Sequence, residues 1–344
     1  MPSHSPLSFF SLLALVALLF SATFGSASPV EKRSARTSPP SGAVVVNVAG
    51  GSGVHTTVSS AVAALPNDNS ARTIFIYPGT YNEQVFITRP GMTTIYGYTT
   101  NNLDHAQNVV NIKHSASASA AGGDDPSGTL RVHKDNFAMY NVNVYNTFGQ
   151  GQQAIAVSAY GSKQGYYACG FYGYQDTLLA EQGTQFYGYT YIQGAVDYVF
   201  GQHAFAFFQS CTLASSGPGS ITAAGPSSSS DGIYVINKAT IEVAPGTGTS
   251  LAGKVYLGRP WSQFARVVYT NSNIGAHVNA LGWDTWSSAS PNTAHVLFAE
   301  FGSSGAGAAG KRASFSKKLS SAAGYTISDV LGSSHTWVDS GYDH

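Results

Sequence analysis

Charged residues, cysteine and long apolar segments are all scarce in this chain of 344 residues. Only 10% of the residues are charged and the formal net charge is +0, so the chain lacks the basic excess that a nucleic-acid-binding surface requires. Two cysteines are too few for a disulfide scaffold. After the N-terminal leader, no apolar segment is long enough for a transmembrane helix. We therefore expect a globular protein that binds neither nucleic acid nor membranes.

Glycine and aromatic residues are abundant instead, with 38 Gly, 20 Tyr and 18 Phe. In this background Gln153, Gln175 and Asp197 recur at one interval, because 175 − 153 = 22 and 197 − 175 = 22. A fixed offset near this value is typical of a parallel β-solenoid, in which each coil returns the chain to the same column. Neighbouring coils lie roughly 4.8 Å apart. The spacing therefore predicts stacked coils with these polar residues on one face.

The same spacing predicts a patch with a chemical use. Asp176 lies beside Gln175, so two carboxamides and two carboxylates converge. One carboxylate would attack or activate, the other would give a proton, and the amides would donate hydrogen bonds to a developing oxyanion. The structural alternative is a ladder of stacked Asn, Gln or Asp, although such ladders usually repeat one residue type.

Five segments resemble, in the same order, the signature segments of pectin methylesterases of the fungal or microbial type: GTYNEQV (79–85), QQAIAV (152–157), GYQDTL (173–178), QGAVDYVFG (193–201) and LGRPW (257–261). The resemblance implies a single-stranded, right-handed parallel β-helix in an all-β protein. It also implies an esterase that removes methyl groups from methylesterified homogalacturonan, a polysaccharide, releasing methanol and leaving pectate. No cofactor is implied.

The resemblance assigns a role to each polar residue of the patch. Asp197 would be the nucleophile, Asp176 the general acid and base, and Gln153 and Gln175 the oxyanion donors. Arg259, in LGRPW, is expected to hold Asp197 ionised through a bidentate ion pair, which leaves the raised pKa to Asp176. The G-x-S-x-G segment of serine esterases is absent, which agrees with a carboxylate nucleophile.

Aromatic residues are the candidates for sugar contacts. We expect Trp261 and Trp283 to flank the groove and to stack on sugar faces, with Phe200 as a further candidate. The alternative for all three is packing in the core. The resemblance also implies that Thr129 reaches the groove. The ten histidines show no paired ligand spacing, so no metal site is expected.

The N-terminal residues have the composition of a leader. Residues 1–27 are interpreted as a secretory signal peptide, with an apolar run at 12–20 and small residues at 25–27. Residues 28–42 contain the pair Lys32-Arg33, which is either a processing site of a propeptide or an ordinary solvated pair. Residues 34–42 are rich in Ser and Pro and are expected to form a flexible lead-in. A secreted monomer is therefore expected.

Residues 43–344 are assigned to the catalytic domain. A short helix over 56–65, with Thr57 as its cap, is expected to cover the open end of the solenoid. Residues 115–128, with Asp124-Asp125, are expected to be a surface loop that holds no metal. Residues 314–323 and 327–331 are expected to form short helices in a C-terminal tail that packs back on the solenoid.

The two cysteines are expected to remain reduced. Cys169 and Cys211 are 42 residues apart, about two coils, which separates their Cα atoms by roughly 10 Å. A disulfide tolerates at most about 7 Å. We expect two buried thiols in one interior column, with Thr190 between them, although pairing of two cysteines in a secreted protein is the familiar alternative.

Two other classes of function remain open. A pectin or pectate lyase would share the fold and the polymer, but would need an Arg or Lys base and usually a carboxylate cluster for calcium. A non-catalytic polysaccharide-binding solenoid would keep the aromatic residues and need neither Asp176 nor Asp197.

Overall fold

The computed structural model describes Met1 and residues 34–248 and 250–344. Apart from Met1, the predicted signal peptide lies outside the described residues, and so does the Lys32-Arg33 pair. From Ser34 to His344 the chain forms one compact unit. Nowhere in the described ranges does a helix have the length and apolar character needed to cross a membrane.

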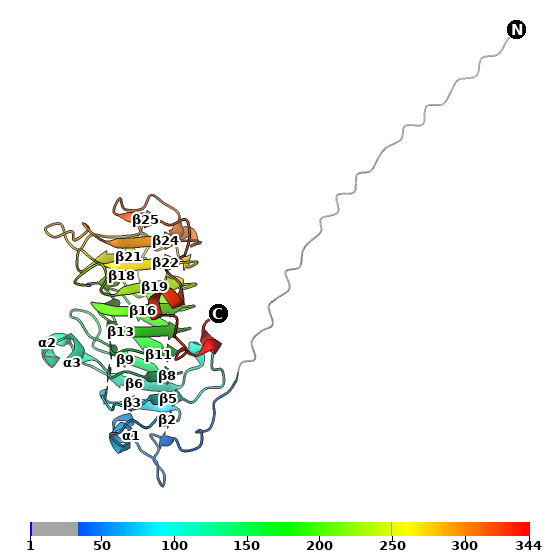
Figure 1. Cartoon of the computed structure of the whole chain (residues 1–344), viewed down its shortest axis with the longest axis vertical. Helices are drawn as coiled ribbons and strands as arrows, with labels where there is room; N and C mark the ends of the chain where they lie inside the picture. Colours follow the sequence, from blue (N-terminus) through cyan, green and yellow to red (C-terminus); the bar gives the residue numbers. More distant parts are fainter. Residues whose placement is uncertain (2–33, 249) are drawn as a thin grey trace. The chain divides into compact units, whose positions relative to one another are not determined.

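The compact unit is a parallel β-helix, as predicted (Figure 1). In the described residues its strands form two hydrogen-bonded sheets. The larger sheet contains β1 (Val44–Val46), β2 (Arg72–Ile76), β4 (Val85–Ile87), β5 (Thr93–Gly97), β7 (Leu130–His133), β8 (Phe137–Tyr140), β10 (Val157–Tyr160), β11 (Gln164–Tyr167), β13 (Leu178–Gly188), β15 (Val199–Gly201), β16 (His203–Gln209), β18 (Gly219–Ala224), β19 (Ile233–Asn237), β21 (Val255–Pro260), β22 (Arg266–Thr270), β24 (Leu297–Phe301) and β25 (Ser316–Lys318).

The smaller sheet contains β3 (Gly79–Asn82), β6 (Val110–His114), β9 (Asn143–Asn146), β12 (Gly170–Tyr172), β14 (Tyr191–Gly194), β17 (Thr212–Ser215), β20 (Thr240–Val243) and β23 (Asn273–Ile274). The larger sheet divides into two columns of parallel strands, one running through β10, β13, β15, β18 and β21 and the other through β11, β13, β16, β19 and β22. We call the first of these the catalytic column, because the candidate residues lie on or beside its strands. β13 belongs to both columns.

The predicted N-terminal helix is confirmed as α1 (Val58–Ala64). The Thr57 hydroxyl accepts from the Ser60 N–H and caps the helix, as expected. Both Glu83 carboxylate oxygens accept N–H groups of the first turn, from Val58 at 2.7 Å and from the next residue at 2.8 Å. Val58 and Ala61 are buried in the interior of the β-helix. The signature residue Glu83 is therefore structural.

The other helices are short: α2 (Ala118–Ala121), α3 (Asp124–Ser127), α4 (Ile327–Leu331) and the 3-10 turns η1 (His105–Gln107), η2 (Ala306–Ala308) and η3 (Ser340–Tyr342). The C-terminal segment returns along the β-helix, where α4 contacts β13 and β16 (Figure 1). The helix predicted over 327–331 is confirmed. The helix predicted over 314–323 is wrong, because β25 forms there and pairs with β24. An open strand edge overrides weak helix propensity, since its backbone groups need partners.

The coil offset beside the candidate site is 21 residues, not the predicted 22, because Leu178 pairs with Val199 and 199 − 178 = 21. Asp176 and Asp197 each lie two residues before these partners, so they occupy the same position on successive coils. Gln175 bridges to residue 196, not to Asp197. The prediction was wrong by one residue because it followed the polar residues, whereas the inward-facing apolar residues set the register.

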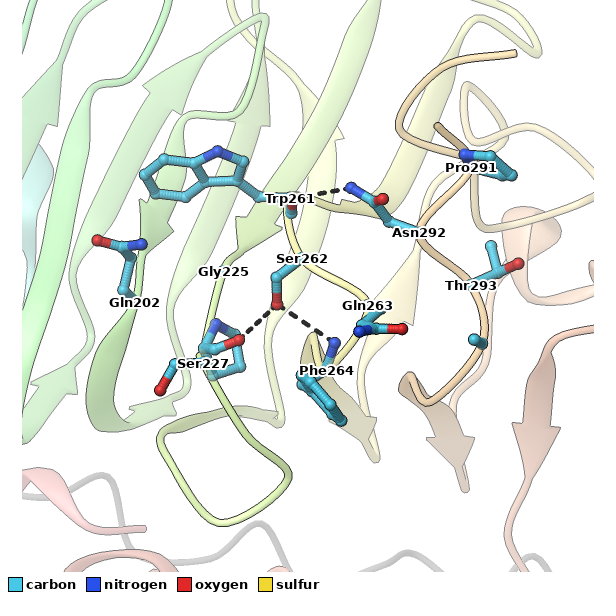
Figure 2. Close-up of a pocket in the computed structure, with 12 residues that line it drawn as sticks. Gln202, Gly225, Ser227, Trp261, Ser262, Gln263, Phe264, Pro291, Asn292 and Thr293 are labelled. Atoms are coloured by element: carbon cyan, nitrogen blue, oxygen red, sulfur yellow. Dashed lines mark hydrogen bonds between the residues drawn. The ribbon is translucent and has the colours of Figure 1, made fainter. Parts of the chain in front are cut away.

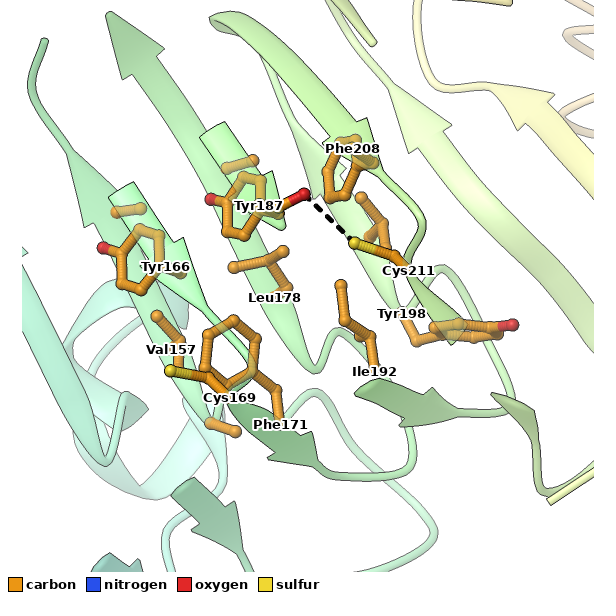
Figure 3. Close-up of a cluster of buried hydrophobic side chains, with 14 of the residues drawn as sticks. Val157, Tyr166, Cys169, Phe171, Leu178, Tyr187, Ile192, Tyr198, Phe208 and Cys211 are labelled. Carbon is orange, nitrogen blue, oxygen red and sulfur yellow. Dashed lines mark hydrogen bonds between the residues drawn. The ribbon is translucent and has the colours of Figure 1, made fainter. Parts of the chain in front are cut away.

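The interior is apolar and aromatic, with the two cysteines in one column (Figure 3). Register places Cys169, Thr190 and Cys211 one coil apart, as predicted. Both thiols are free and fully buried, so the disulfide alternative is wrong. The Cys211 Sγ donates to the backbone oxygen of Tyr187 at 3.2 Å. Burial raises the pKa of both thiols to about 12, which keeps them protonated and unreactive.

Residues 34–42 are held to the β-helix at Arg36, which differs from the flexible lead-in that we predicted. The Arg36 backbone pairs with Thr99, with N···O distances of 2.8 and 3.0 Å. Its guanidinium lies over the rings of Tyr96 and Tyr140, at 4.2 and 5.1 Å from their centroids. A cation stacked on two rings is stabilised on one face of each, which explains why this segment is ordered against the outside of the β-helix.

Candidate active site

Asp176 and Asp197 lie at matching corners of the β-helix, just before β13 and β15. Both have left-handed backbone conformations, with φ of 64° and 51°, which Asp tolerates better than most residues. Each backbone N–H donates to the following coil, from Asp176 to Val196 at 3.0 Å and from Asp197 to Ser220 at 2.7 Å. The shared turn presents the two carboxylates on the same face, about one strand spacing of roughly 4.8 Å apart.

Arg259 reaches Asp197 from β21, two coils further along. Its Nε donates to Oδ1 at 2.9 Å and its Nη2 donates to Oδ2 at 2.7 Å, which is the predicted bidentate pair. In the strand register, Phe200, Ala223 and Arg259 follow one another on the outward side of the catalytic column. Ala223 lies between Phe200 and Arg259 in this register. Its side chain is only a methyl group, so it leaves room for the Arg259 guanidinium to extend back over β18 towards Asp197.

Burial raises the pKa of both carboxylates, but the neighbouring charges separate them. Asp176 is buried, and desolvation together with the charges of Asp197 and Asp124 raises its pKa to about 9. The pKa of Asp197 is also raised by burial, but the hydrogen bonds and charge of Arg259 oppose that shift. In the described residues no side chain donates a hydrogen bond to the Asp176 carboxyl. Asp176 therefore holds its proton more tightly than Asp197, whose charged form Arg259 stabilises.

The two amides border the same cavity of about 240 Å³ and have their N–H groups available. The side chain of Gln153 is exposed and that of Gln175 is half-buried. Within the ranges that the structure describes, neither amide hydrogen-bonds to another residue, so both are free to donate to a bound oxygen. The cavity is lined by Asp124, Gln153, Gln175, Asp176, Asp197, Phe200, Ala223, Arg259, Trp261 and Trp286.

An apolar cluster forms the floor of the catalytic face, separate from the interior core. It contains Leu179, Phe200 and Ala223, with Trp261 and Trp286 packed against them. Phe200 is only 4% exposed and its ring centroid lies 6.3 Å from that of Trp261. The predicted places of Trp261 and Phe200 beside the site are therefore correct, with Phe200 acting as floor and Trp261 as wall.

Two predicted substrate contacts are wrong. Trp283 is 1% exposed and stacks on Phe298, and its Nε1 donates to Glu300, so it belongs to the interior core. Thr129 is fully buried, and its hydroxyl donates to the Tyr145 backbone oxygen at 2.9 Å. Both side chains are buried, and each polar group already has a partner, the Glu300 carboxylate for Trp283 and a backbone oxygen for Thr129.

Two residues of the cavity were missed by the sequence analysis. Trp286, three positions after Trp283 in GWDTW, is the tryptophan that the cavity exposes, and the Arg259 guanidinium lies 4.4 Å from its ring centroid. Asp124 was placed in a surface loop, but α2 and α3 bring it to the cavity. The pairing of two tryptophans in one short segment was a usable signal for Trp286. No local pattern distinguishes Asp124 from Asp125.

A second, larger cavity of about 780 Å³ shares Trp261 with the first. Figure 2 shows Trp261 with Gln202 on one side and Asn292 on the other. The Asn292 side-chain amide donates to the Trp261 backbone oxygen at 2.9 Å. None of the residues that line this cavity is charged: Gln202, Gly225, Pro226, Ser227, Trp261, Ser262, Gln263, Phe264, Pro291, Asn292, Thr293 and Ala294. It extends the binding surface without adding an acid or a base.

Comparisons with known proteins agree with this geometry. The family model named Pectinesterase matches residues 43–332. A pectinesterase of Aspergillus niger is 47% identical over 336 residues, covering 95% of this chain and 98% of the relative. A pectinesterase of Aspergillus aculeatus is also 47% identical and covers 89% of this chain and 94% of the relative.

Solved structures of pectin methylesterases have the same fold as this chain. The crystal structure of the Aspergillus niger enzyme in deglycosylated form matches with a TM-score of 0.83 and 41% identity, over 90% of this chain and 100% of the other. The pectin methylesterase from carrot matches with a TM-score of 0.77 and 28% identity, over 86% and 95% of the two chains.

Proposed function

We propose that this chain, which belongs to the pectinesterase family, demethylates esterified homogalacturonan through a covalent intermediate on Asp197. Members of this family are carboxylic ester hydrolases that act on pectin, and the products are methanol and pectate. The lyase and the non-catalytic binding module, which the sequence left open, are set aside by this membership. The roles of individual residues below are our proposal.

In the first half of the reaction the Asp197 carboxylate attacks the ester carbonyl carbon. A carbon–oxygen bond forms and the carbonyl electron pair moves to the oxygen, where the amides of Gln153 and Gln175 donate to the oxyanion. The oxyanion then collapses and expels methoxide. Asp176 gives this leaving group its proton, so methanol departs and Asp197 is held as a mixed anhydride.

In the second half Asp176, now ionised, accepts a proton from water. The resulting hydroxide attacks the acyl carbon of the anhydride, and the bond from that carbon to Asp197 breaks. The substrate leaves as a galacturonic acid unit, which releases its proton to the solvent and becomes a carboxylate, and Asp197 returns as a carboxylate. Asp176 has regained its proton, so both residues are in their starting states.

The observation that carries the proposal is the asymmetric environment of two equivalent aspartates. The bidentate contact with Arg259 belongs to Asp197 alone, whereas Asp176 is buried without a cation of its own. Two adjacent carboxylates can act as nucleophile and acid only if their protonation states differ, and this arrangement supplies the difference.

The wider setting of the enzyme is proposed from the sequence. The signal-like residues 1–27 support secretion, and the substrate is an extracellular type of polysaccharide. We propose a monomer that needs no cofactor, because the residues assigned above complete the reaction by themselves.

The test is methanol release from highly methylesterified pectin, with ultraviolet absorbance of unsaturated ends followed in the same tube. We expect methanol without new absorbance. Asp197→Ala should reduce methanol release by about 10⁴-fold or more, while the folded β-sheet signal and polymer binding remain. Asp104→Asn, which removes a carboxylate outside the cavity, is the matched control. Full activity of Asp197→Ala would remove that residue from its role, and absorbance without methanol would overturn the esterase.

A further inference from the structure

The two cavities contain almost nothing that can pair with an anionic sugar. Among the residues that line the catalytic cavity, Arg259 is the only cation, and both of its hydrogen-bonding edges that face Asp197 are occupied by that carboxylate. The larger cavity, which continues past Trp261, is lined without any charged side chain. A galacturonate unit with a free carboxylate would therefore find no counterion in either cavity.

Asp124 adds a carboxylate that no cation in the described ranges pairs with. Within the described ranges its carboxylate has no hydrogen bond and no ion pair, although it is half-buried and lines the catalytic cavity. Its neighbour Asp125 is the opposite case, because Arg131, His133 and Ser158 all contact its carboxylate. One aspartate of the pair fastens α3 to β7 and β10, and the other is left facing the site.

The position of Asp124 is fixed by contacts on both sides of α3. The Asn146 side-chain amide donates to the backbone oxygens of Ser127 and Ile155, at 3.1 and 3.0 Å. The Gln84 amide donates to the backbone oxygens of Pro126 and Gly128, at 2.7 and 2.8 Å. Because these anchors come from separate coils, the charge of Asp124 is held at the cavity by the β-helix itself.

We propose that Asp124 and the uncharged larger cavity make this enzyme select methyl esters whose neighbouring units are also esterified, by disfavouring free carboxylates beside the reacting ester. This inference rests on the proposed function and names the form of pectin on which it acts. Asp124 is the specificity-determining residue: it repels a neighbouring carboxylate across a cavity that offers no compensating cation.

The larger cavity supports the same choice from a separate set of groups. The Trp261 ring packs on Gly225, where an added Cβ would lie 2.6 Å from a ring atom. A glycine is therefore needed at this position for the ring to pack there. The Gln202 amide and the Asn292 side-chain oxygen are placed around the ring (Figure 2), while the Asn292 amide nitrogen donates to the backbone oxygens of Pro260 and Trp261. Aromatic faces and neutral amides suit the hydroxyl and ester groups of an uncharged sugar, and they do not offset the desolvation of a carboxylate.

The decisive experiment compares two short oligogalacturonides at neutral pH. One is fully methylesterified and the other carries free carboxylates beside the remaining esters, with pectate as a competing inhibitor in both cases. The wild-type chain should prefer the first substrate and bind pectate weakly. Asp124→Asn should lower the inhibition constant of pectate and narrow the ratio of kcat/KM values, each by about three- to tenfold. Asp124→Lys should move both quantities further in the same direction.

Three controls keep the outcome interpretable. Asp124→Glu, which keeps the charge, should keep the direction of the preference between the two substrates. Asp104→Asn, which removes a charge outside both cavities, should behave as the wild type. Gln202→Lys places a cation in the larger cavity, so it should favour the partly de-esterified substrate even if the Asp124 variants fold poorly.

Two results would overturn the inference. If Asp124→Asn changes the rates on both substrates by one factor, Asp124 acts on Asp176 and not on selection. If neither the inhibition constant nor the ratio changes in Asp124→Asn and Gln202→Lys, electrostatic selection is absent. Absence of methanol from either substrate with the wild-type chain is a different result, since it would contradict the proposed function.

Discussion

The coil that ends in Asp176 and the coil that ends in Asp197 have the same backbone and opposite chemistry. Both aspartates follow the same strand register, both adopt a left-handed conformation, and both donate their N–H to the next coil. The difference comes from two coils away, because Arg259 reaches only Asp197. A repeating fold therefore supplies two equal positions, and a side chain from a later coil makes them unequal.

The comparison also shows why small residues matter on the outer face. Leu179, Phe200 and Ala223 occupy successive positions beside the site, and they differ in size rather than polarity. The position next to Arg259 is the smallest of the three. In this solenoid the interior demands regular apolar packing, whereas the outer face is free to vary from coil to coil, and the chemistry arises from that variation.

Removing Arg259 should abolish the difference in ionisation between Asp176 and Asp197, and we expect this change to have the largest effect on turnover. Asp197 would then be a buried carboxylate without a counterion, so its pKa would rise further and it would hold a proton in place of attacking. We expect kcat for methanol release to fall by about 10²- to 10³-fold in Arg259→Ala. Arg259→Lys should recover only part of this loss, because an ammonium group cannot make the bidentate contact.

The check on this prediction is the pH profile together with the rate. The acid limb of kcat/KM should move to higher pH in Arg259→Ala, while circular dichroism shows an intact fold. A rate within twofold of the wild type would show that the ion pair does not control the ionisation of Asp197.

Raising the pH should also abolish the difference in ionisation between the two aspartates, because it removes the proton of Asp176. The pKa of this carboxyl is raised to about 9, so the acid form is present below that value and is lost as the pH rises through it. Activity should fall by about tenfold for each pH unit above the pKa. The same proton is bound more tightly in the folded chain, so its contribution to stability is full below the unfolded pKa and disappears as the pH rises through the folded pKa.

Initial rates across alkaline buffers, with stability followed in parallel, measure this limb. Asp176→Asn should be slow at every pH and should lack the limb. An unchanged alkaline limb in that variant would assign the titration to another group.

Substitutions of the two tryptophans of GWDTW should have different effects, one on substrate binding and the other on stability, and both should have the smallest effect on turnover. Trp286→Ala removes a wall of the cavity, so we expect the KM for pectin to rise about three- to tenfold with little change in kcat or thermal stability. Trp283→Ala removes a core side chain, so it should lower the free energy of unfolding by about 3–5 kcal/mol with KM nearly unchanged. Denaturant unfolding and kinetics on the same samples decide the matter, and reversed effects would contradict the assignment of the two residues.

Much of the fold was predictable because its repeat is set by the buried apolar residues of the strands and by the residues of the turns between them. The parallel β-helix, the Thr57-capped helix and the reduced cysteines all followed from spacing and end signals. The grouping of Asp176, Asp197 and Arg259 in one cavity was predictable because all three lie within strongly patterned segments. The coil offset was missed by one, since amide side chains on an outer face do not fix the register.

The remaining errors have a common physical cause. Trp283 and Trp286 are the same residue type, three positions apart, and only three-dimensional packing decides which of them is buried. Asp124 reaches the cavity through contacts of Gln84 and Asn146, which are distant in sequence. Within residues 314–323, β25 (Ser316–Lys318) pairs with a strand edge that no local pattern reveals. Local sequence describes each segment, but it does not say which distant segment completes it.

The long strand β13 has a consequence for how the molecule opens. It passes from the catalytic column into the adjacent one without a break and pairs with β10, β11, β15 and β16. Any local unfolding that exposes this coil must separate β13 from strands of both the preceding and the following coil, whereas each terminal coil has a neighbour on one side only. Asp176 therefore lies just before a segment that should be among the last to exchange its amide hydrogens. Thermal fraying would reach the ends of the stack before it reaches Asp176 and Asp197.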